Sequence, residues 1–267
     1  MKGSDIMKYR IKTKLNLGIT NQNYQSVDNL FIRYSNPFTN LFIDHQNEIC
    51  VLEQIKNTNL TLPIVDYGYD NEHFFLVTPY YPTLQPLSAV KITKQILSQV
   101  ATIIQQLWAI EIKPNSKIKT FNPQQFLTTF KTAVQKQLVN LAPYEDKIIY
   151  AKLKPSELVL CHNDLNSGNL VFLYHNLYLI DFEYTMLNDK FFDIASFASE
   201  TLTTKADQTA WFSLFNLTPS QQEKVAMWMY YQNILWIYWA NYMYEQTNQK
   251  IFLDIIEGKW TNLQKNN

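Results

Sequence analysis

The stretch Leu158–Tyr184, LVLCHNDLNSGNLVFLYHNLYLIDFEY, decides the fold of this 267-residue chain. Its short apolar runs VLC, NLVFL and LYLI are separated by acids and amides, and the turn Tyr174–Asn176 divides the last two runs. Apolar runs of this length between polar turns are typical of buried strands. A hairpin over this stretch would bring Asn169 and Asp181 together at the end opposite the turn, with Asp164 on the loop just before.

These side chains fit the chemistry of phosphoryl transfer. Hard divalent cations prefer oxygen ligands, and Mg²⁺ usually takes one or two carboxylates together with substrate phosphates. A phosphoryl transferase also needs a carboxylate that orients or deprotonates the attacking hydroxyl. Polar groups beside buried strands are costly unless they bind something. We therefore expect Asp164, Asn169 and Asp181 to form a site rather than a structural cluster.

The chain before this stretch is rich in predicted strands. YRIKTKL, NYQSV and NLFIRYS, within residues 8–34, are short and alternating and are separated by polar turns. TNLFIDHQNEICVLEQIK has apolar residues at mostly helical spacing, and HFFLVTPYY indicates a buried strand. PTLQP follows with two prolines and predicts a linker.

The second half is predicted to be mainly helical. Apolar residues step by three and four from Ala89 to Leu107 and again from Phe126 to Leu141. The Trp-rich stretch Ala226–Tyr244 indicates a buried helix. The order predicts an α+β chain of two lobes: a small β-rich lobe of residues 1–81 and a larger α-helical lobe of residues 82–267. A ligand site is expected in the cleft between them.

Composition excludes several functional classes. Lys+Arg and Asp+Glu are each 23, so no net charge draws the chain to nucleic acid or an anionic membrane. Three amides interrupt Ala226–Tyr244, which argues against stable membrane insertion. Cys50 and Cys161 lack zinc-ligand spacing, and Met1–Lys12 has no apolar core of a signal peptide. We expect a cytoplasmic protein; the sequence leaves its oligomeric state open.

The opening stretch also carries a family pattern. His162, Asp164, Asn169 and the pair Asp181-Phe182 resemble the catalytic and metal loops of the kinase-like fold, in the HxDxxxxN form of the aminoglycoside phosphotransferase superfamily. The continuation IDFEYTMLNDKFFDIASFASE is similar to choline/ethanolamine kinases, which carry DFEY, then an Asn, then FDI, then a Glu. The resemblance implies a two-lobed protein-kinase-like fold and phosphorylation of choline by ATP with Mg²⁺.

The resemblance also implies roles for residues. Asp164 would be the base or orienting carboxylate, His162 would brace the loop, and Asn169 and Asp181 would ligate Mg²⁺. LNLGITNQNY is similar to the phosphate-covering loop GGxTNxxY with one glycine missing, LFIRYS to the next strand with Arg in place of Lys, and FIDHQNE to the helix bearing the partner acid. The residues then expected at the nucleotide are Gly18, Thr20, Asn21, Arg33, Glu48, Thr78 and Tyr80.

Choline is a quaternary ammonium that cannot donate an N–H hydrogen bond. Aromatic faces hold such cations by about 0.5–2 kcal/mol each, and a nearby carboxylate adds charge. ILWIYWANYMYE is similar to the family's tryptophan-bearing helix beside the amine pocket. The residues expected at the acceptor are Asp164, Tyr184, Glu200, Trp236 and Trp239.

Other interpretations stay open at this point. Trp236 and Trp239 also fit core packing, Glu200 a solvated helix position and Arg33 a surface position. Trp108 stands where the family often has His and receives no role. The acceptor could instead be ethanolamine, thiamine or an aminoglycoside, although the segment after residue 205 is aromatic and poor in acids. A degenerate module that binds an amine or nucleotide without turnover would fit the single glycine of the first loop.

Overall fold

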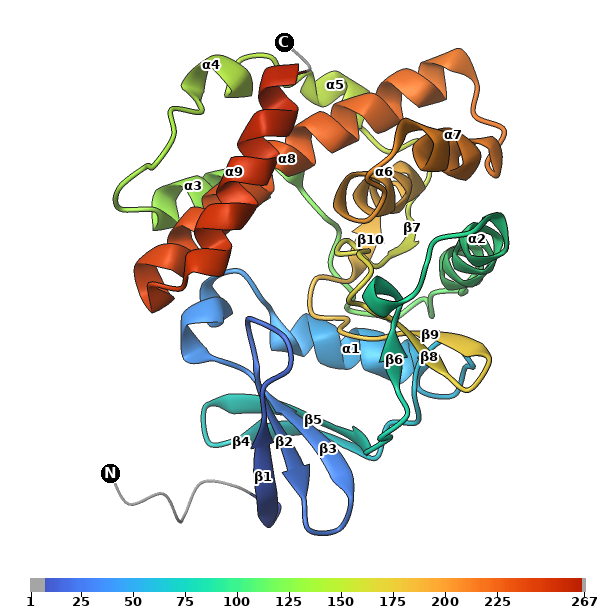
Figure 1. Cartoon of the computed structure of the whole chain (residues 1–267), viewed down its shortest axis with the longest axis vertical. Helices are drawn as coiled ribbons and strands as arrows, with labels where there is room; N and C mark the ends of the chain where they lie inside the picture. Colours follow the sequence, from blue (N-terminus) through green and yellow to red (C-terminus); the bar gives the residue numbers. More distant parts are fainter. Residues whose placement is uncertain (1–7, 266–267) are drawn as a thin grey trace.

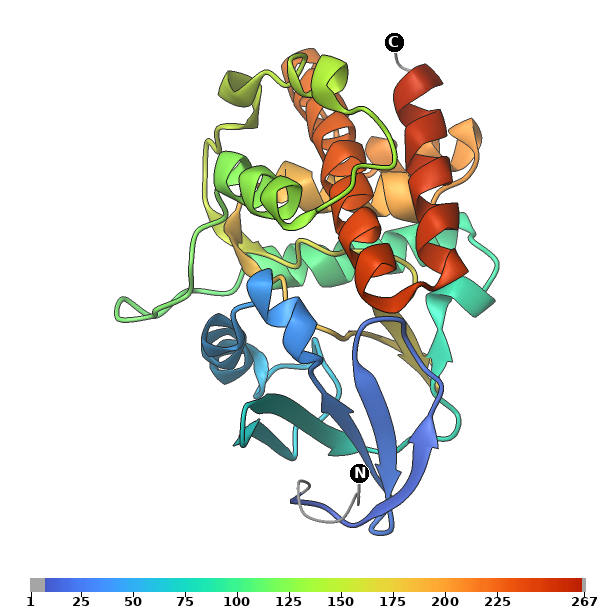
Figure 2. The same cartoon turned by 90° about the vertical axis from the view of Figure 1, so that its left-hand side faces the viewer.

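The structure is a computed structural model that describes residues 8–265; the first seven residues of the N-terminal stretch and the last two of the chain lie outside it. Strands β1–β5 and helix α1 lie together at one end, and helices α3, α8 and α9 lie at the other (Figures 1 and 2). This arrangement confirms the predicted α+β, two-lobed fold.

The first sheet is antiparallel, with strand order β1-β2-β3-β5-β4. Successive side chains of a strand point to opposite faces, so Ile32 and Tyr34 enter a small apolar core while Arg33 faces the other way. The strands are β1 (Ile11–Leu15), β2 (Gln22–Ser26), β3 (Leu30–Tyr34), β4 (Asp66–Asp70) and β5 (His73–Pro79).

Helix α1 (His45–Ile55) lies between β3 and β4 in the sequence and contacts later parts of the chain. Asp44 caps its first turn, because its carboxylate accepts hydrogen bonds from the backbone N–H groups of Gln46 and Asn47. Asn47 then donates to the carbonyl of Thr185 at 2.8 Å and accepts from the backbone N–H of Lys119 at 2.7 Å. These contacts hold the helix against the segments around Thr185 and Lys119, and thereby fix the position of its buried Glu48.

The long helix α8 (Pro219–Thr247) organises the helical part. A capping box between Thr218 and Gln221 begins it, and Asn248 ends it in the left-handed conformation. Within residues 8–265, no helix is long and apolar enough to span a bilayer. The other helices are α2 (Lys94–Trp108), α3 (Pro123–Ala133), α4 (Ala142–Glu145), α5 (Tyr150–Leu153), α6 (Lys190–Glu200), α7 (Lys205–Ser213), α9 (Lys250–Lys265) and the 3-10 helices η1 (Pro37–Leu41) and η2 (Leu87–Ala89).

The opening stretch forms short strands between these two parts. The predicted hairpin is confirmed, and the backbone N–H of Ile180 donates to the carbonyl of Asn169 at 3.0 Å across its open end. Asn169 and Asp181 therefore meet as expected. The strands are β7 (Val159–Cys161), which pairs with β10 (Met186–Asn188), and β8 (Leu170–Leu173), which pairs with β6 (Gln85–Pro86) and β9 (Asn176–Leu179).

Two predicted helices are shorter than the stretches over which apolar residues repeat at helical spacing. Helix α3 ends at Ala133 instead of continuing to Leu141, because Glu245 accepts hydrogen bonds from the next backbone N–H groups and Asn241 accepts one from Leu138 at 2.8 Å. Helix α2 begins at Lys94 rather than near Ala89, because Thr93 caps it. In α3, partners on α8 take the backbone donors that a continued helix would have used internally. In α2, the N-cap sets where the helix begins.

Candidate active site

Asp164 lies on the loop after β7, with its carboxylate held by two amides. The side-chain nitrogen of Asn169 donates to one carboxylate oxygen at 2.8 Å, and that of Asn166 donates to the other at 3.0 Å. Burial raises the pKa of Asp164 to about 7, and repulsion from Asp181 and Glu200 adds to this. The result is a fixed carboxyl group that changes charge near neutral pH.

The buried Asp193 of α6 holds this loop from behind. Its carboxylate accepts from the backbone N–H of His162 at 3.0 Å and of Asn163 at 2.9 Å, and from the indole N–H of Trp108 at 3.0 Å. Asn163 has a left-handed φ of 61°, which a short polar side chain tolerates. The sequence pattern assigned no role to Trp108. Its hydrogen bond to Asp193 shows that it helps to hold the carboxylate that supports this loop.

His162 braces the same loop through its ring. Its Nε2 lies 2.9 Å from the carbonyl oxygen of Ile180, next to Asp181. Burial lowers the pKa of His162 below its usual range, so the ring is neutral at pH 7 and donates to that carbonyl. The loop bearing Asp164 and the segment bearing Asp181 are thereby joined.

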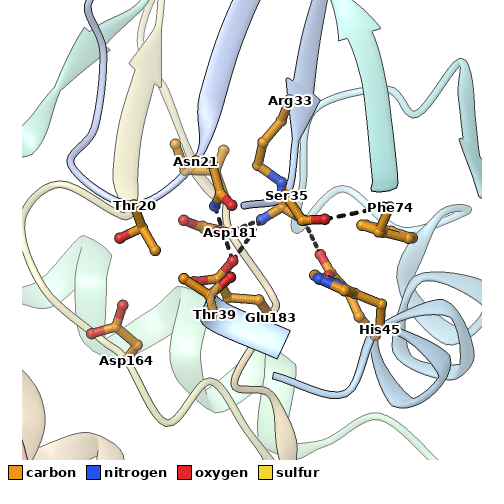
Figure 3. A network of polar contacts seen from close by, with 12 residues as sticks. Thr20, Asn21, Arg33, Ser35, Thr39, His45, Phe74, Asp164, Asp181 and Glu183 are labelled. Carbon is orange, nitrogen blue, oxygen red and sulfur yellow. Dashed lines mark hydrogen bonds and ion pairs between the residues drawn. The ribbon is translucent and has the colours of Figure 1, made fainter. Parts of the chain in front are cut away.

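Arg33 of β3 is the centre of a buried charge cluster (Figure 3). Its guanidinium contacts the carboxylates of Glu48 and Asp181 and lies 3.5 Å from that of Glu183. Burial opposes the ionisation of Glu48, but Arg33 and His45 outweigh it and hold the pKa of Glu48 below its usual range. Burial and Asp181 raise the pKa of Glu183. Arg33 is thus buried in the cluster and is not the surface residue that one interpretation allowed.

The loop between β1 and β2 meets this cluster. Gly18 has a φ of 67°, in the left-handed region that favours glycine. Asn23 donates to the carbonyl of Leu17 at 2.6 Å, and Asn21 donates to Glu183 at 3.0 Å. Asparagine side chains therefore hold this loop, which has only one glycine. The hydrogen bond from Asn21 also places Glu183 at the site, a residue to which the sequence pattern had assigned no role.

The donor set near Asp181 fits Mg²⁺. Asn169 uses its amide nitrogen on Asp164, so its amide oxygen is the atom that could ligate a metal, beside the carboxylate of Asp181. A single guanidinium faces three carboxyl groups, which leaves negative charge for a cation. In the described part of the chain no three His, Cys, Asp or Glu residues form a metal cluster. A bound Mg²⁺ would therefore depend on nucleotide phosphates, as is usual for this ion.

One cavity of about 1360 Å³ is bordered by Arg33, Asp164, Asn169, Asp181 and Glu183. A family model described as Choline/ethanolamine kinase matches residues 13–231. The chain belongs to the choline/ethanolamine kinase family. Membership agrees with the resemblance found in the sequence.

Known proteins support the same fold. Protein LicA of Haemophilus influenzae is 33% identical over 92 residues, which are 30% of this chain and 33% of LicA, so the match spans about a third of that relative. The crystal structure of choline kinase LicA from Streptococcus pneumoniae has a TM-score of 0.78 at 21% identity and covers 96% of this chain and 94% of that one. Spectinomycin phosphotransferase APH(9)-Ia, in complex with ADP and spectinomycin, has a TM-score of 0.67 at 13% identity and covers 93% and 88%.

In this choline/ethanolamine kinase family member, most of the predicted site residues border the cavity. His162 and Glu48 do not; they lie behind it and hold Ile180 and Arg33. The predicted residues that border the cavity are Gly18, Thr20, Asn21, Arg33, Thr78, Tyr80, Asp164, Asn169, Asp181, Tyr184, Glu200, Trp236 and Trp239.

One end of the cavity has aromatic walls. The rings of Trp236 and Trp239 meet edge to face at 6.1 Å, and Tyr184 meets Trp236 at 5.8 Å. The Tyr184 hydroxyl and both indole nitrogens are buried, and within residues 8–265 the only hydrogen-bonding contact of these three groups is between the Tyr184 hydroxyl and the Trp239 indole. The tryptophans are mostly buried, as the core interpretation expected, yet they also line the cavity. Glu200 is not a solvated helix residue, because it pairs with Lys259 of α9.

Proposed function

We propose that the protein transfers the γ-phosphoryl group of ATP to the hydroxyl of choline and forms phosphocholine and ADP. The observation that carries the proposal is the single cavity in which Asp164, Asn169 and Asp181 lie at one part and the aromatic walls at another. A phosphoryl donor and a small cation would both fit there. We propose that residues 1–81 and 82–267 act as the two lobes that enclose them.

The reaction needs a base near the acceptor hydroxyl. Asp164 would accept the hydroxyl proton while the oxygen attacks the γ-phosphorus and the bond to the β–γ bridging oxygen breaks. Its pKa near 7 matches this task, because a base works best when its pKa is close to the ambient pH. Asn169 keeps the carboxylate oriented, and Asp193 fixes the loop that bears it.

The nucleotide would lie along the sheet side of the cavity. We propose Gly18, Thr20 and Asn21 over its phosphates, Arg33 beside them, and Thr78 and Tyr80 further along the same wall. Glu48 positions Arg33. Asn169 and Asp181 would hold Mg²⁺, which when bound neutralises charge on the transferring phosphate.

The acceptor end suits a quaternary ammonium. Tyr184, Trp236 and Trp239 offer aromatic faces, and each face contributes about 0.5–2 kcal/mol to cation binding. Glu200 supplies the carboxylate of this end. Choline needs no acceptor for an N–H group, so an aromatic wall with one carboxylate is sufficient for it.

Ethanolamine is the second candidate. Among the described residues the buried hydroxyl of Tyr184 has only the Trp239 indole as a hydrogen-bonding neighbour, and its oxygen could accept a further N–H from a primary ammonium. Choline would leave that hydroxyl unused. This observation keeps a primary amine in consideration for the same pocket.

An ADP-release assay separates these acceptors. Choline, ethanolamine, thiamine and kanamycin are each added with ATP and Mg²⁺, and Asp164→Asn serves as the matched inactive variant. The proposal expects the highest kcat/KM with choline. Preference for another acceptor would replace choline, and nucleotide binding without turnover on any acceptor would indicate a non-catalytic binding module.

A further inference from the structure

The positively charged side chain of Lys259 borders the same cavity as the aromatic walls. The ammonium of Lys259, on α9, contacts the carboxylate of Glu200 at the end of α6, and the hydroxyl of Ser199 donates to the same carboxylate oxygen at 3.2 Å. Lys259 is only 7% exposed. Both residues border the cavity together with Trp236 and Trp239.

The pair is costly to separate. A buried ammonium loses much of its hydration, and the partner carboxylate compensates for that loss. Glu200 also lies close enough to Asp164 to raise its pKa, so its charge is felt at the reacting end of the cavity. The carboxylate proposed for the acceptor cation is therefore already neutralised by a side chain of the protein.

We propose that Lys259 is a specificity-determining residue that competes with the acceptor's ammonium for Glu200. The inference rests on the proposed function. A primary ammonium gains most of its binding from hydrogen bonds to a carboxylate, so it loses heavily when Lys259 holds that carboxylate. A quaternary ammonium binds mainly through aromatic faces and loses less. Lys259 thereby biases the pocket toward quaternary amino alcohols.

The test removes this charge and keeps most of the side-chain length. Lys259→Met should lower the Kd and KM of ethanolamine about tenfold or more and those of choline about threefold, where tenfold corresponds to about 1.4 kcal/mol. The preference for choline over ethanolamine therefore narrows. Lys265→Met, an exposed lysine on the same helix, is the matched control and should change neither value.

Calorimetric titration of both amines into the wild type and the variants gives the decisive comparison. Lys259→Gln, which keeps a polar contact to Glu200, serves where the methionine variant fails to fold, and should shift the preference in the same direction. If the wild type binds choline but either variant binds both amines as before, or more weakly, the inference fails alone. If the wild type binds and phosphorylates neither amine, the proposed function fails, and the role of Lys259 with it.

Discussion

Replacing Arg33 tests how the charge cluster supports the fold. The chain has a natural control, because Arg33 pairs in the interior while Arg10 pairs with Asp28 on the surface. The side chains of Arg33 and Glu48 are 7% and 0% exposed, whereas those of Arg10 and Asp28 are 81% and 62% exposed. The two substitutions Arg33→Met and Arg10→Met remove the same group from opposite environments.

The expected magnitudes differ several-fold. Removing one partner of a buried ion pair leaves an uncompensated charge and costs about 3–5 kcal/mol of unfolding free energy. A surface pair contributes about 0–1 kcal/mol. In a chain of this size 1 kcal/mol corresponds to about 2–4 °C, so Arg33→Met should lower the melting temperature by about 6–20 °C. Arg10→Met should lower it by about 4 °C at most.

Urea unfolding and thermal melts of ligand-free protein measure both variants. The double variant Arg33→Met/Glu48→Gln should regain part of the lost unfolding free energy. The second substitution removes the buried charge that the first one leaves without a partner. If Arg33→Met were no less stable than Arg10→Met, or if Glu48→Gln destabilised it further, Glu48 would not depend on Arg33 as we argue.

Three further predictions concern the site. A native pKa of about 7 for Asp164 means that the folded state keeps a proton that the unfolded state has lost, so wild-type stability falls as pH rises from about 4 to 7, by up to about 1.4 kcal/mol per unit. Without metal, the melting temperature of Asp164→Asn relative to that of the wild type should therefore rise between about pH 4 and 7; a constant difference would contradict the shift. Trp108→Phe removes one donor to Asp193 and should lower kcat about three- to tenfold with both KM values unchanged; a change confined to KM would argue against a positioning role. Trp236→Ala should raise the acceptor KM about 2- to 30-fold with little effect on the ATP KM, and equal effects on both would favour a pure core role.

Local pattern was sufficient for the polar hairpin. The alternation around Asn169 and Asp181 specifies two short strands, and a hairpin with its turn at one end must bring its other ends together. The same reasoning predicted the strands within residues 8–34, one of which bears Arg33. The hairpins β8–β9 and β2–β3 pair neighbouring segments of the sequence, whereas β3 also pairs with β5 across α1 and β4.

Contacts between distant segments were outside the reach of such patterns. Glu200 and Lys259 are joined only because α6 and α9 border the same cavity. Trp108 reaches Asp193 across 85 positions of sequence. Helix α3 stops at Ala133 because Glu245 takes its next backbone donors. Periodicity describes one element at a time, so it gives no partner for these groups.

Phosphorus NMR of choline, ATP and Mg²⁺ incubated with the protein tests the central claim most directly, because it detects the new phosphomonoester itself. We predict a phosphocholine signal that grows in step with ADP, and no such signal with Asp164→Asn even though that variant still binds ATP. ADP without phosphocholine, or an undiminished signal with Asp164→Asn, would contradict the account.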